Sequence, residues 1–178
     1  MIVKNIFYKN FFFKDKKYYQ NIKKTKKIYK LLKKEIENLD IPQLHSYDQN
    51  YELGFSLQTI KKFSKFENII LIGMGGSILG AKSIYSFLKD KIKKKVFFFD
   101  NLDENLYSQL NKLRGINNSC FIIISKSGNT LETITNLSVI SSKISLKNKL
   151  IFITEITNNN LLNIATNCNA EIIEHKNF

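Results

Sequence analysis

The chain is poor in the residues on which metal sites and disulfide frameworks depend. Its 178 residues include two cysteines, Cys120 and Cys168, and two histidines, His45 and His175. Neither cysteine belongs to a C-x-x-C pair, and no metal-ligand spacing occurs. We therefore expect no metal and no disulfide, and we interpret both cysteines as buried thiols in a reducing compartment.

Long apolar runs and targeting segments are also missing. No run approaches the roughly 20 apolar residues that a membrane-spanning helix needs. The apolar stretch from Met1 to Phe7 contains a lysine, and no small-residue cleavage site follows it. With 43% apolar residues, the chain has enough material for the core of one domain and an appendage. We expect a cytoplasmic protein with no membrane partner.

Arginine is scarce although the chain is strongly basic. The net charge is +13, from 28 basic and 15 acidic residues, yet Arg114 is the only arginine. A basic chain suggests a polyanion partner, but proteins that read bases or clamp phosphates rely on arginine. We interpret the lysine excess as a bias towards AT-rich codons and expect no nucleic-acid partner. A lysine-rich nucleic-acid binder remains the least favoured alternative.

Residues 1–66 are expected to form a mainly helical extension. Apolar residues recur at helical spacing in a lysine-rich segment, at Ile28, Leu31, Leu32, Ile36 and Leu39. This pattern predicts an amphipathic helix that ends before Pro42, and a second helix is expected from Ser56 to Phe66. The aromatic segment around Phe11 to Phe13 is ambiguous between strand and loop. For the amphipathic helix we favour packing on a neighbouring domain over binding to a membrane surface.

Residues 67–178 alternate between short apolar runs and helical patterns. The expected strands are 69–72, 96–99, 121–124, 150–153 and 171–173. Continuous β-branched or aromatic runs of this length are typical of strands buried on both faces, and the helices between them supply the crossovers of a parallel sheet. The fold class is therefore α/β, with a doubly wound, five-stranded, flavodoxin-like parallel sheet.

A glycine-rich loop, Gly73-Met74-Gly75-Gly76-Ser77, follows the first of these strands. Its glycines allow close approach and positive φ, and Ser77 could cap the next helix. Two nucleotide-binding motifs fit poorly, although Asp100 could imitate the ribose-binding acid. The dinucleotide fingerprint lacks its third glycine at Ile78, and Ala81 precedes the lysine that a P-loop would need. Alone, the loop fits a tight turn without a ligand equally well.

A second loop, Ser125-Lys126-Ser127-Gly128-Asn129-Thr130, follows the third strand. Solvated turns more often carry aspartate or proline than three hydroxyl residues and a lysine. Asn129 and Glu132 have the spacing of a capping box, which predicts a helix from Thr130 to about Ile144. In parallel sheets, ligands bind beyond the carboxyl ends of the strands, where both loops lie. Hydroxyls and helix N-termini there would suit a phosphate group.

The two loops together resemble the glucose-6-phosphate isomerase family. Residues 73–80 are similar to its G-x-G-G-S-x-L-G segment, and residues 125–133 to its S-K-[ST]-x-x-T-x-E-[TP] segment. The resemblance covers residues 68–178 and implies a sugar isomerase (SIS) fold that binds glucose 6-phosphate or fructose 6-phosphate without a cofactor. The implied phosphate-binding residues are Gly76, Ser77, Ile78, Ser125, Lys126, Ser127, Gly128, Asn129 and Thr130, partly through backbone N–H groups.

The resemblance also implies which parts of the family's machinery lie elsewhere. Family members continue past the position of Phe178 into a second SIS domain that carries the groups for ring opening and proton transfer. We therefore expect the N-terminal portion of an aldose–ketose isomerase of glycolysis and gluconeogenesis, homodimeric at full length, with no catalytic residue in this chain. Glu132 and Glu155 are not assigned as general bases. The alternatives are a stand-alone SIS phosphosugar-binding module or part of an aminosugar isomerase.

Overall fold

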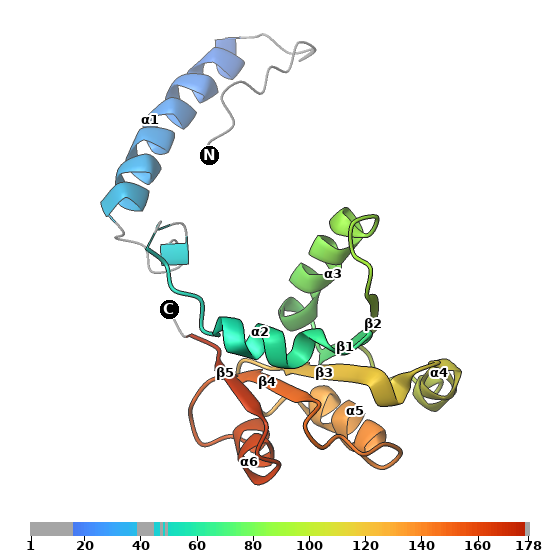
Figure 1. Ribbon diagram of the computed structural model, residues 1–178. Coiled ribbons are helices and arrows are strands. Elements are labelled where there is room, and N and C mark those ends of the chain that lie inside the picture. The colour runs from blue at the N-terminus through green and yellow to red at the C-terminus, as the bar shows by residue number, and fades with distance from the viewer. Residues whose placement is uncertain (1–15, 39–44, 47, 49, 177–178) are drawn as a thin grey trace. The chain divides into compact units, whose positions relative to one another are not determined.

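The computed structural model describes residues 16–38, 45–46, 48, 50–176 of the chain (Figure 1). These residues belong to two compact units, one reaching to Glu52 and one formed by Leu53–Asn177. The second unit thus includes a helix that precedes residue 67. The predicted division of the chain into an extension over residues 1–66 and a sugar-phosphate domain over residues 67–178 stays a prediction.

The first unit is dominated by the helix α1, Lys16–Asn38. The amphipathic helix expected before Pro42 is present, and it begins well before Ile28. No residue of α1 is buried, and Ile28 and Leu31 are each more than 60% exposed. Its packing on a neighbouring domain stays a prediction. The ambiguous segment around Phe11 to Phe13 lies outside the described residues.

The second unit is built on a five-stranded parallel sheet with the strand order β2-β1-β3-β4-β5. The strands are β1 (Asn68–Gly73), β2 (Lys95–Phe99), β3 (Ser119–Ile124), β4 (Leu150–Thr154) and β5 (Glu171–Glu174). All four neighbouring pairs are parallel. Each expected strand is therefore confirmed to within about two residues, and so is the α/β fold class.

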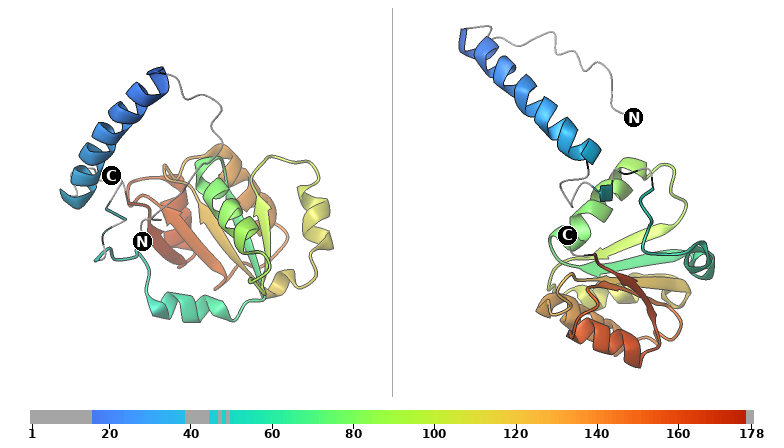
Figure 2. Two further views of the ribbon diagram at one scale, coloured as in Figure 1. Left: turned by 90° about the horizontal axis from the view of Figure 1, so that it is seen from above. Right: turned by 90° about the vertical axis from the view of Figure 1, so that its left-hand side faces the viewer.

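Helices cover both faces of the sheet (Figure 2). The helices α2 (Leu57–Ser64) and α3 (Gly76–Leu88) lie on one side, and α5 (Leu131–Ser141) and α6 (Asn160–Asn167) lie on the other. Two short helices, α4 (Leu106–Lys112) and η2 (Ile116–Asn118), connect β2 to β3. Ser56 caps α2 by accepting a hydrogen bond from the amide of Thr59, so the predicted start of this helix is confirmed.

Alternate residues of the strands face two separate hydrophobic clusters. Phe121, Ile123 and Phe152 are fully buried in the cluster beneath α5 and α6. Cys120 and Ile151 point the other way and pack with Phe63 and Phe66 at α2. This alternation follows from the two-residue period of a strand, and it explains why the strands read as continuous apolar runs.

The two cysteines occupy different environments. Cys120 is 2% exposed, and burial raises the pKa of its thiol to about 12. Cys168 is exposed at the end of α6. The expectation of two buried thiols was therefore wrong for Cys168, because this residue follows the last turn of α6 and borders an open pocket instead of the packed core.

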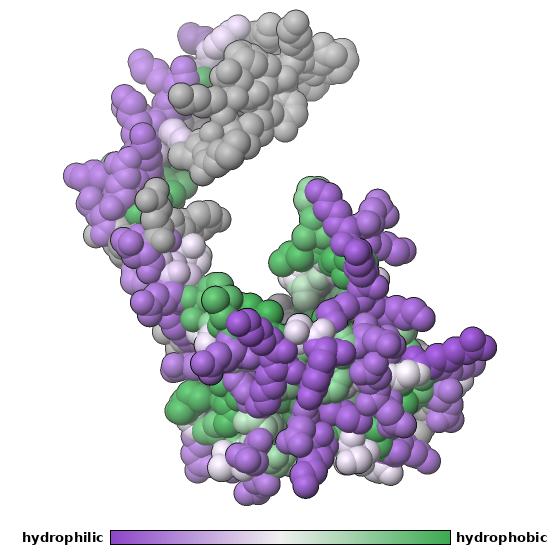
Figure 3. All heavy atoms as spheres, in the orientation of Figure 1, coloured by the Kyte–Doolittle hydropathy of each residue, from purple (hydrophilic) through white to green (hydrophobic). Residues whose placement is uncertain are grey.

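The outer side of α3 is apolar and uncovered within its own unit. Ile84 is 62% exposed and Phe87 is 89% exposed, whereas Ile78 on the inner side is buried. Figure 3 shows apolar side chains gathered over α2 and α3 on this face. A helix with apolar residues on both sides is usually buried on both sides. Within the unit Leu53–Asn177, only the inner side of α3 is buried.

Two side chains of α2 hold a carboxylate of β5, which predicts a pH dependence of stability. The Thr59 hydroxyl and the Lys62 ammonium donate to Glu171 over 2.7 and 2.8 Å, respectively. The hydrogen bonds from Lys62 and Thr59 lower the pKa of Glu171 below its usual 4.5. A lowered carboxyl pKa stabilises the fold above the unfolded pKa, and this stability is lost as the pH falls through the folded pKa.

We therefore expect Glu171→Gln to reduce the free energy of unfolding at pH 7 and to have no effect well below pH 4.5. The loss should stay under about 1 kcal/mol because Lys62 is half exposed and solvent screens the pair. Urea titrations at several pH values measure this loss in the free energy of unfolding. The matched control is Glu174→Gln in the same strand, which should show no such pH-dependent difference. Equal effects of the two variants would contradict this assignment.

Candidate functional site

The strand order brings the two motif loops together at one point of the sheet. The chain leaves β1 in one direction to form β2 and then returns to form β3 on the other side of β1. The carboxyl ends of β1 and β3 are therefore the switch point at which ligands bind in doubly wound sheets. Gly73 ends β1 beside Ile124, the last residue of β3, and the two motif loops start from these residues. The sequence predicted that both loops lie beyond the carboxyl ends of the strands, but it did not predict that β1 and β3 are neighbours.

Gly73 permits the close approach of the two strand ends. A Cβ atom at this position would lie 2.9 Å from the Ile124 carbonyl oxygen and 3.4 Å from Ser77 Cβ. A side chain at Gly73 would therefore push the two loops apart. The predicted role of this glycine in close approach is confirmed.

The first loop turns sharply into α3. Gly75 has a φ of +52° and is the N-cap residue of α3, so the expected positive φ is confirmed at this glycine. Ser77 is half-buried inside the first turn and does not cap the helix as expected, because the turn begins earlier, at Gly75. Ile78 is buried, and nothing lies within 4 Å of a Cβ position at Gly76. Open space therefore lies beside the first residue of α3.

The second loop combines one buried hydroxyl with exposed polar groups. Ser125 is 2% exposed, and its hydroxyl lies 2.8 Å from the Thr130 hydroxyl. Ser127 and Asn129 are exposed, and Ser127 Oγ accepts a hydrogen bond from the amide of Asn129 over 3.3 Å. Thr130 is the N-cap residue of α5, with no side-chain bond to the helix. The unpaired first amides of α5 thus open towards this loop.

The expected capping box of α5 does not form. The helix starts at Leu131 and ends at Ser141, three residues before Ile144. Asn129 Oδ1 instead accepts a hydrogen bond from the amide of Asn160 over 3.0 Å. The residue that was expected to cap its own helix therefore holds the start of the next one, because the N-terminus of α6 lies within reach.

A third loop, between β4 and α6, supports the second one and was missed in the sequence. Asn159 is buried, and its Oδ1 caps α6 by accepting from the amide of Leu162 over 2.8 Å. The amide of Leu161 donates to the carbonyl oxygen of Gly128 over 3.0 Å. The N-cap position of Asn159 before an apolar helix was the available signal. Its contact with Gly128 was visible only in the structure.

Gly128 fits against Asn159 with no room for a side chain. Its φ is +66°, and a Cβ atom there would lie 1.9 Å from Asn159 Oδ1. A glycine is thus required on both grounds, backbone conformation and space. The second and third loops form one interlocked unit.

One lysine brings a positive charge to these loops. Lys126 is about half exposed, and its ammonium lies 3.8 Å from a carboxylate oxygen of Glu155. The amide of Glu155 also donates to the carbonyl oxygen of Lys126 over 3.1 Å. At this distance the ion pair leaves Lys126 able to reorient towards an added anion.

The neighbouring acidic residue is already paired. Asp100, at the end of β2, forms an ion pair with Lys82 of α3. Asp100 was the candidate ribose-binding acid of a dinucleotide motif, and Lys82 was the candidate lysine of a P-loop. Because these two side chains pair with each other, neither motif has its key side chain available for a nucleotide. No cluster of metal-ligating side chains occurs within the described residues, and none of the described helices is long and apolar enough to cross a membrane.

Residues 40–175 match the family model of phosphoglucose isomerase. A glucose-6-phosphate isomerase of Methanocaldococcus jannaschii is 41% identical over 112 residues, which cover 61% of this chain and 26% of that protein. The chain thus spans about a quarter of the length of that relative.

Solved structures share the fold. A glucose-6-phosphate isomerase from Chlamydia trachomatis has a TM-score of 0.54 and 24% identity, covering 64% of this chain and 23% of that one. A protein of E. coli CFT073, solved as a complex, has a TM-score of 0.57 and 20% identity, covering 84% and 73% of the two chains. Because the family match spans most of the sequence and both of its motif loops meet at the switch point of the sheet, this chain belongs to the phosphoglucose isomerase family.

Proposed function

We propose that the loops after β1 and β3 bind the phosphate of glucose 6-phosphate or fructose 6-phosphate, as part of an enzyme that interconverts these sugars. The observation that carries the proposal is the meeting of the two hydroxyl- and glycine-rich loops at the switch point between β1 and β3. Family membership supports the choice of substrate, because the relative in M. jannaschii is named glucose-6-phosphate isomerase.

The residues of the site take different roles in this proposal. Ser77, Ser127 and Thr130 offer hydroxyl groups to the phosphate oxygens, and Lys126 offers its charge. Hydrogen bonds to an ionised group are roughly twice as strong as neutral ones. The amides at Gly76 and at the start of α5 add the favourable end of a helix dipole. The amide of Ile78, which the family resemblance also implied, already donates to the carbonyl oxygen of Gly75 over 3.1 Å.

Three further residues hold these groups in place. Ser125 is buried and hydrogen-bonded to Thr130, so its main contribution is to orient that hydroxyl. Asn129 and Gly128 connect the loop to α6 through Asn160 and Leu161. A loop fixed on a rigid scaffold binds with less loss of conformational entropy.

Phosphate binding would contribute to catalysis by positioning the sugar. A dianionic phosphate held at one end places the sugar carbons against an acid–base group elsewhere, and binding energy of this remote kind can lower the barrier of the chemical step. We assign no catalytic residue, no metal and no nucleotide cofactor to this chain. We further propose a cytoplasmic role in glycolysis and gluconeogenesis, and a homodimer at full length.

Two alternatives within the same fold are a stand-alone phosphosugar-binding module and part of an aminosugar isomerase. The E. coli protein is matched over 73% of its own length, so the fold also occurs in a chain not much longer than this one. Calorimetric titration with fructose 6-phosphate and with glucosamine 6-phosphate separates the substrates. Stronger binding of the amino sugar would favour the second alternative.

We expect the 178-residue chain by itself to bind fructose 6-phosphate without isomerising it. The reason is that a general base must lie within about 3 Å of the proton it takes, and such groups contribute roughly 10²–10⁴-fold in rate. Glu155 is held near Lys126, and Glu132 lies in the first turn of α5. A coupled assay of isomerisation measures the turnover. Activity that a single substitution at Glu132 or Glu155 abolished would place the catalytic centre in this chain.

A further inference from the structure

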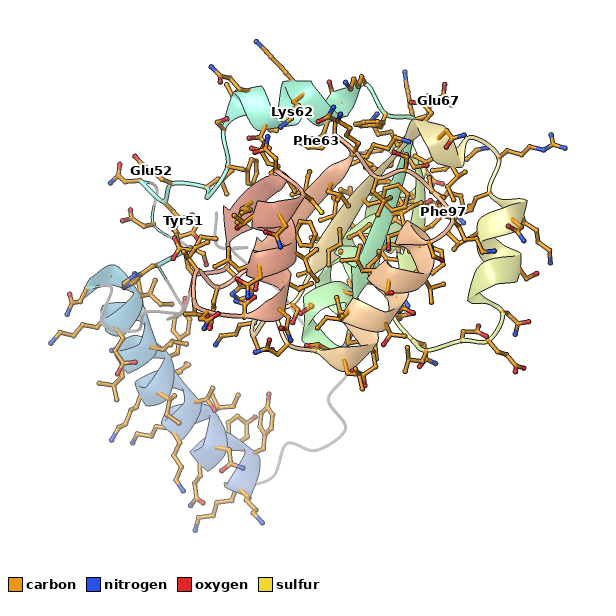
Figure 4. The ribbon with its side chains drawn as sticks, turned by 90° about the horizontal axis from the view of Figure 1, so that it is seen from below. Tyr51, Glu52, Lys62, Phe63, Glu67 and Phe97 are labelled. Carbon is orange, nitrogen blue, oxygen red and sulfur yellow. The ribbon has the colours of Figure 1, made fainter. Side chains whose placement is uncertain are left out.

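A cavity of about 360 Å³ opens at the amino end of the sheet, opposite the motif loops. It is lined by Glu67, Asn68, Lys93, Lys95, Arg114 and Gly115. Figure 4 shows Glu67 where the chain passes from α2 towards β1. The only arginine of the chain and two lysines thus surround one small space, and the proposed phosphosugar site does not use them.

A buried network holds the turn that carries Arg114. Asn68 is 3% exposed, and its side-chain amide donates to the carbonyl oxygens of Arg114 and Gly115 over 3.4 and 3.0 Å. Ser119 Oγ also donates to the Gly115 carbonyl over 3.2 Å. Gly115 has a φ of +78°. The backbone under the guanidinium is therefore fixed by groups that water cannot readily reach.

Lys94, which lies between Lys93 and Lys95 in the sequence, fixes the opposite wall of the cavity. Lys94 donates to the carbonyl oxygen of Ser64 over 2.8 Å and also to that of Phe66. Lys95 begins β2 directly beside Asn68 in the parallel register. Lys94 thus contacts the segment at the end of α2, whereas Lys93 and Lys95, on either side of it in the sequence, both line the cavity.

The three cations of this cavity differ from the lysines that form ion pairs in the same unit. Lys62, Lys82 and Lys126 each lie within 4.0 Å of a carboxylate oxygen. Within the described part of the chain, no ion pair joins Lys93, Lys95 or Arg114 to a carboxylate, and Glu67 forms none. Three like charges around one space repel each other unless an anion joins them.

We propose that this cavity is a second anion site, which binds a small multivalent anion such as pyrophosphate or an organic polyphosphate. The volume suits a small molecule, since ligand pockets of proteins range from about 300 to 1,000 Å³. Arg114 offers paired donors for phosphate oxygens, and the two lysines add charge. Glu67 disfavours the anion and so sets a limit on its affinity.

A nucleic-acid backbone is the less favoured occupant. Such a partner makes many phosphate contacts along an extended basic surface, whereas these three cations border one small, open cavity. The site also stands independently of the proposed phosphosugar site, because the two lie at opposite ends of the parallel strands.

Calorimetric titration of pyrophosphate into the chain tests the proposal, in a Ser127→Asp background that disables the proposed phosphosugar site. We expect saturable one-to-one binding that Arg114→Gln, Lys93→Gln and Lys95→Gln each weaken about fivefold. Glu67→Gln should instead tighten binding about threefold, because it removes the like charge. The matched control is Lys61→Gln, which removes the same charge from an exposed position of α2 and should leave the affinity unchanged.

Three outcomes would overturn the proposal. They are no saturable binding, equal weakening by Lys61→Gln, and an unchanged affinity in Glu67→Gln. Citrate at matched ionic strength tests whether carboxylate anions fit as well as phosphates. A random duplex DNA that bound with the same variant pattern, while pyrophosphate did not bind, would assign the surface to nucleic acid. Because fructose 6-phosphate is titrated separately, failure of the proposed function would be seen independently.

Discussion

Ser127→Asp is expected to abolish binding of fructose 6-phosphate while the fold persists. Ser127 is exposed in the loop after β3, where the proposed phosphate would lie against the start of α5. The substitution places a carboxylate in that space and removes a hydroxyl donor. Like charges in contact at a binding site cost several kcal/mol, so we expect an affinity at least about a hundredfold lower.

Calorimetry with fructose 6-phosphate measures the loss, and circular dichroism checks the fold. Ser127→Ala removes only the hydroxyl and should weaken binding about tenfold. The matched control is Ser138→Asp, which adds the same charge at an exposed position farther along α5 and should have little effect. Unchanged affinity in Ser127→Asp would refute the phosphate assignment. So would a chain that bound glucose as well as glucose 6-phosphate.

Gly128→Ala is expected to destabilise the fold strongly. The new methyl group would overlap Asn159 Oδ1, which caps α6, and the backbone φ of +66° is unfavourable for alanine. Strain at such a position costs roughly 1–3 kcal/mol, and loss of a helix cap about 1 kcal/mol more. We therefore expect the free energy of unfolding to fall by about 2–4 kcal/mol. Sugar-phosphate binding should fall with it.

Gly80→Ala is the matched control for this substitution. Gly80 lies inside α3 with nothing within 4 Å of its Cβ position, and its φ is not positive. Alanine in a helix interior is favoured over glycine by roughly 0.5–1 kcal/mol. Urea titrations should therefore show the two alanine variants moving stability in opposite directions. Similar stability of Gly128→Ala and the natural chain would mean that Asn159 can leave the cap without cost.

Local patterns in the sequence predicted the sheet well because each strand carries its own signal. The runs at Ile69 to Ile72 and Phe121 to Ile124 are apolar at every position, and both became strands buried on two faces. The glycines after β1 also marked their backbone requirements locally. Gly75 has positive φ and Gly73 lies against β3, as expected.

Predictions about caps failed because capping depends on which groups come within reach. Asn129 and Glu132 have the spacing of a capping box, yet Asn129 bonds to the amide of Asn160, far along the chain. Ser77 lies past Gly75, the residue at the N-cap position of α3, and so comes too late to cap it. A side chain with several available partners takes the one that the tertiary fold places nearest.

The sequence by itself determined the strands, the parallel α/β class and the pair of motif loops, since apolar periodicity and glycine positions are properties of short segments. Only the tertiary structure decided how these segments meet. It joined the loops through Asn159 and Gly128, and it brought Lys93, Lys95 and Arg114 around one cavity. These contacts depend on strand order and register, which no single segment encodes.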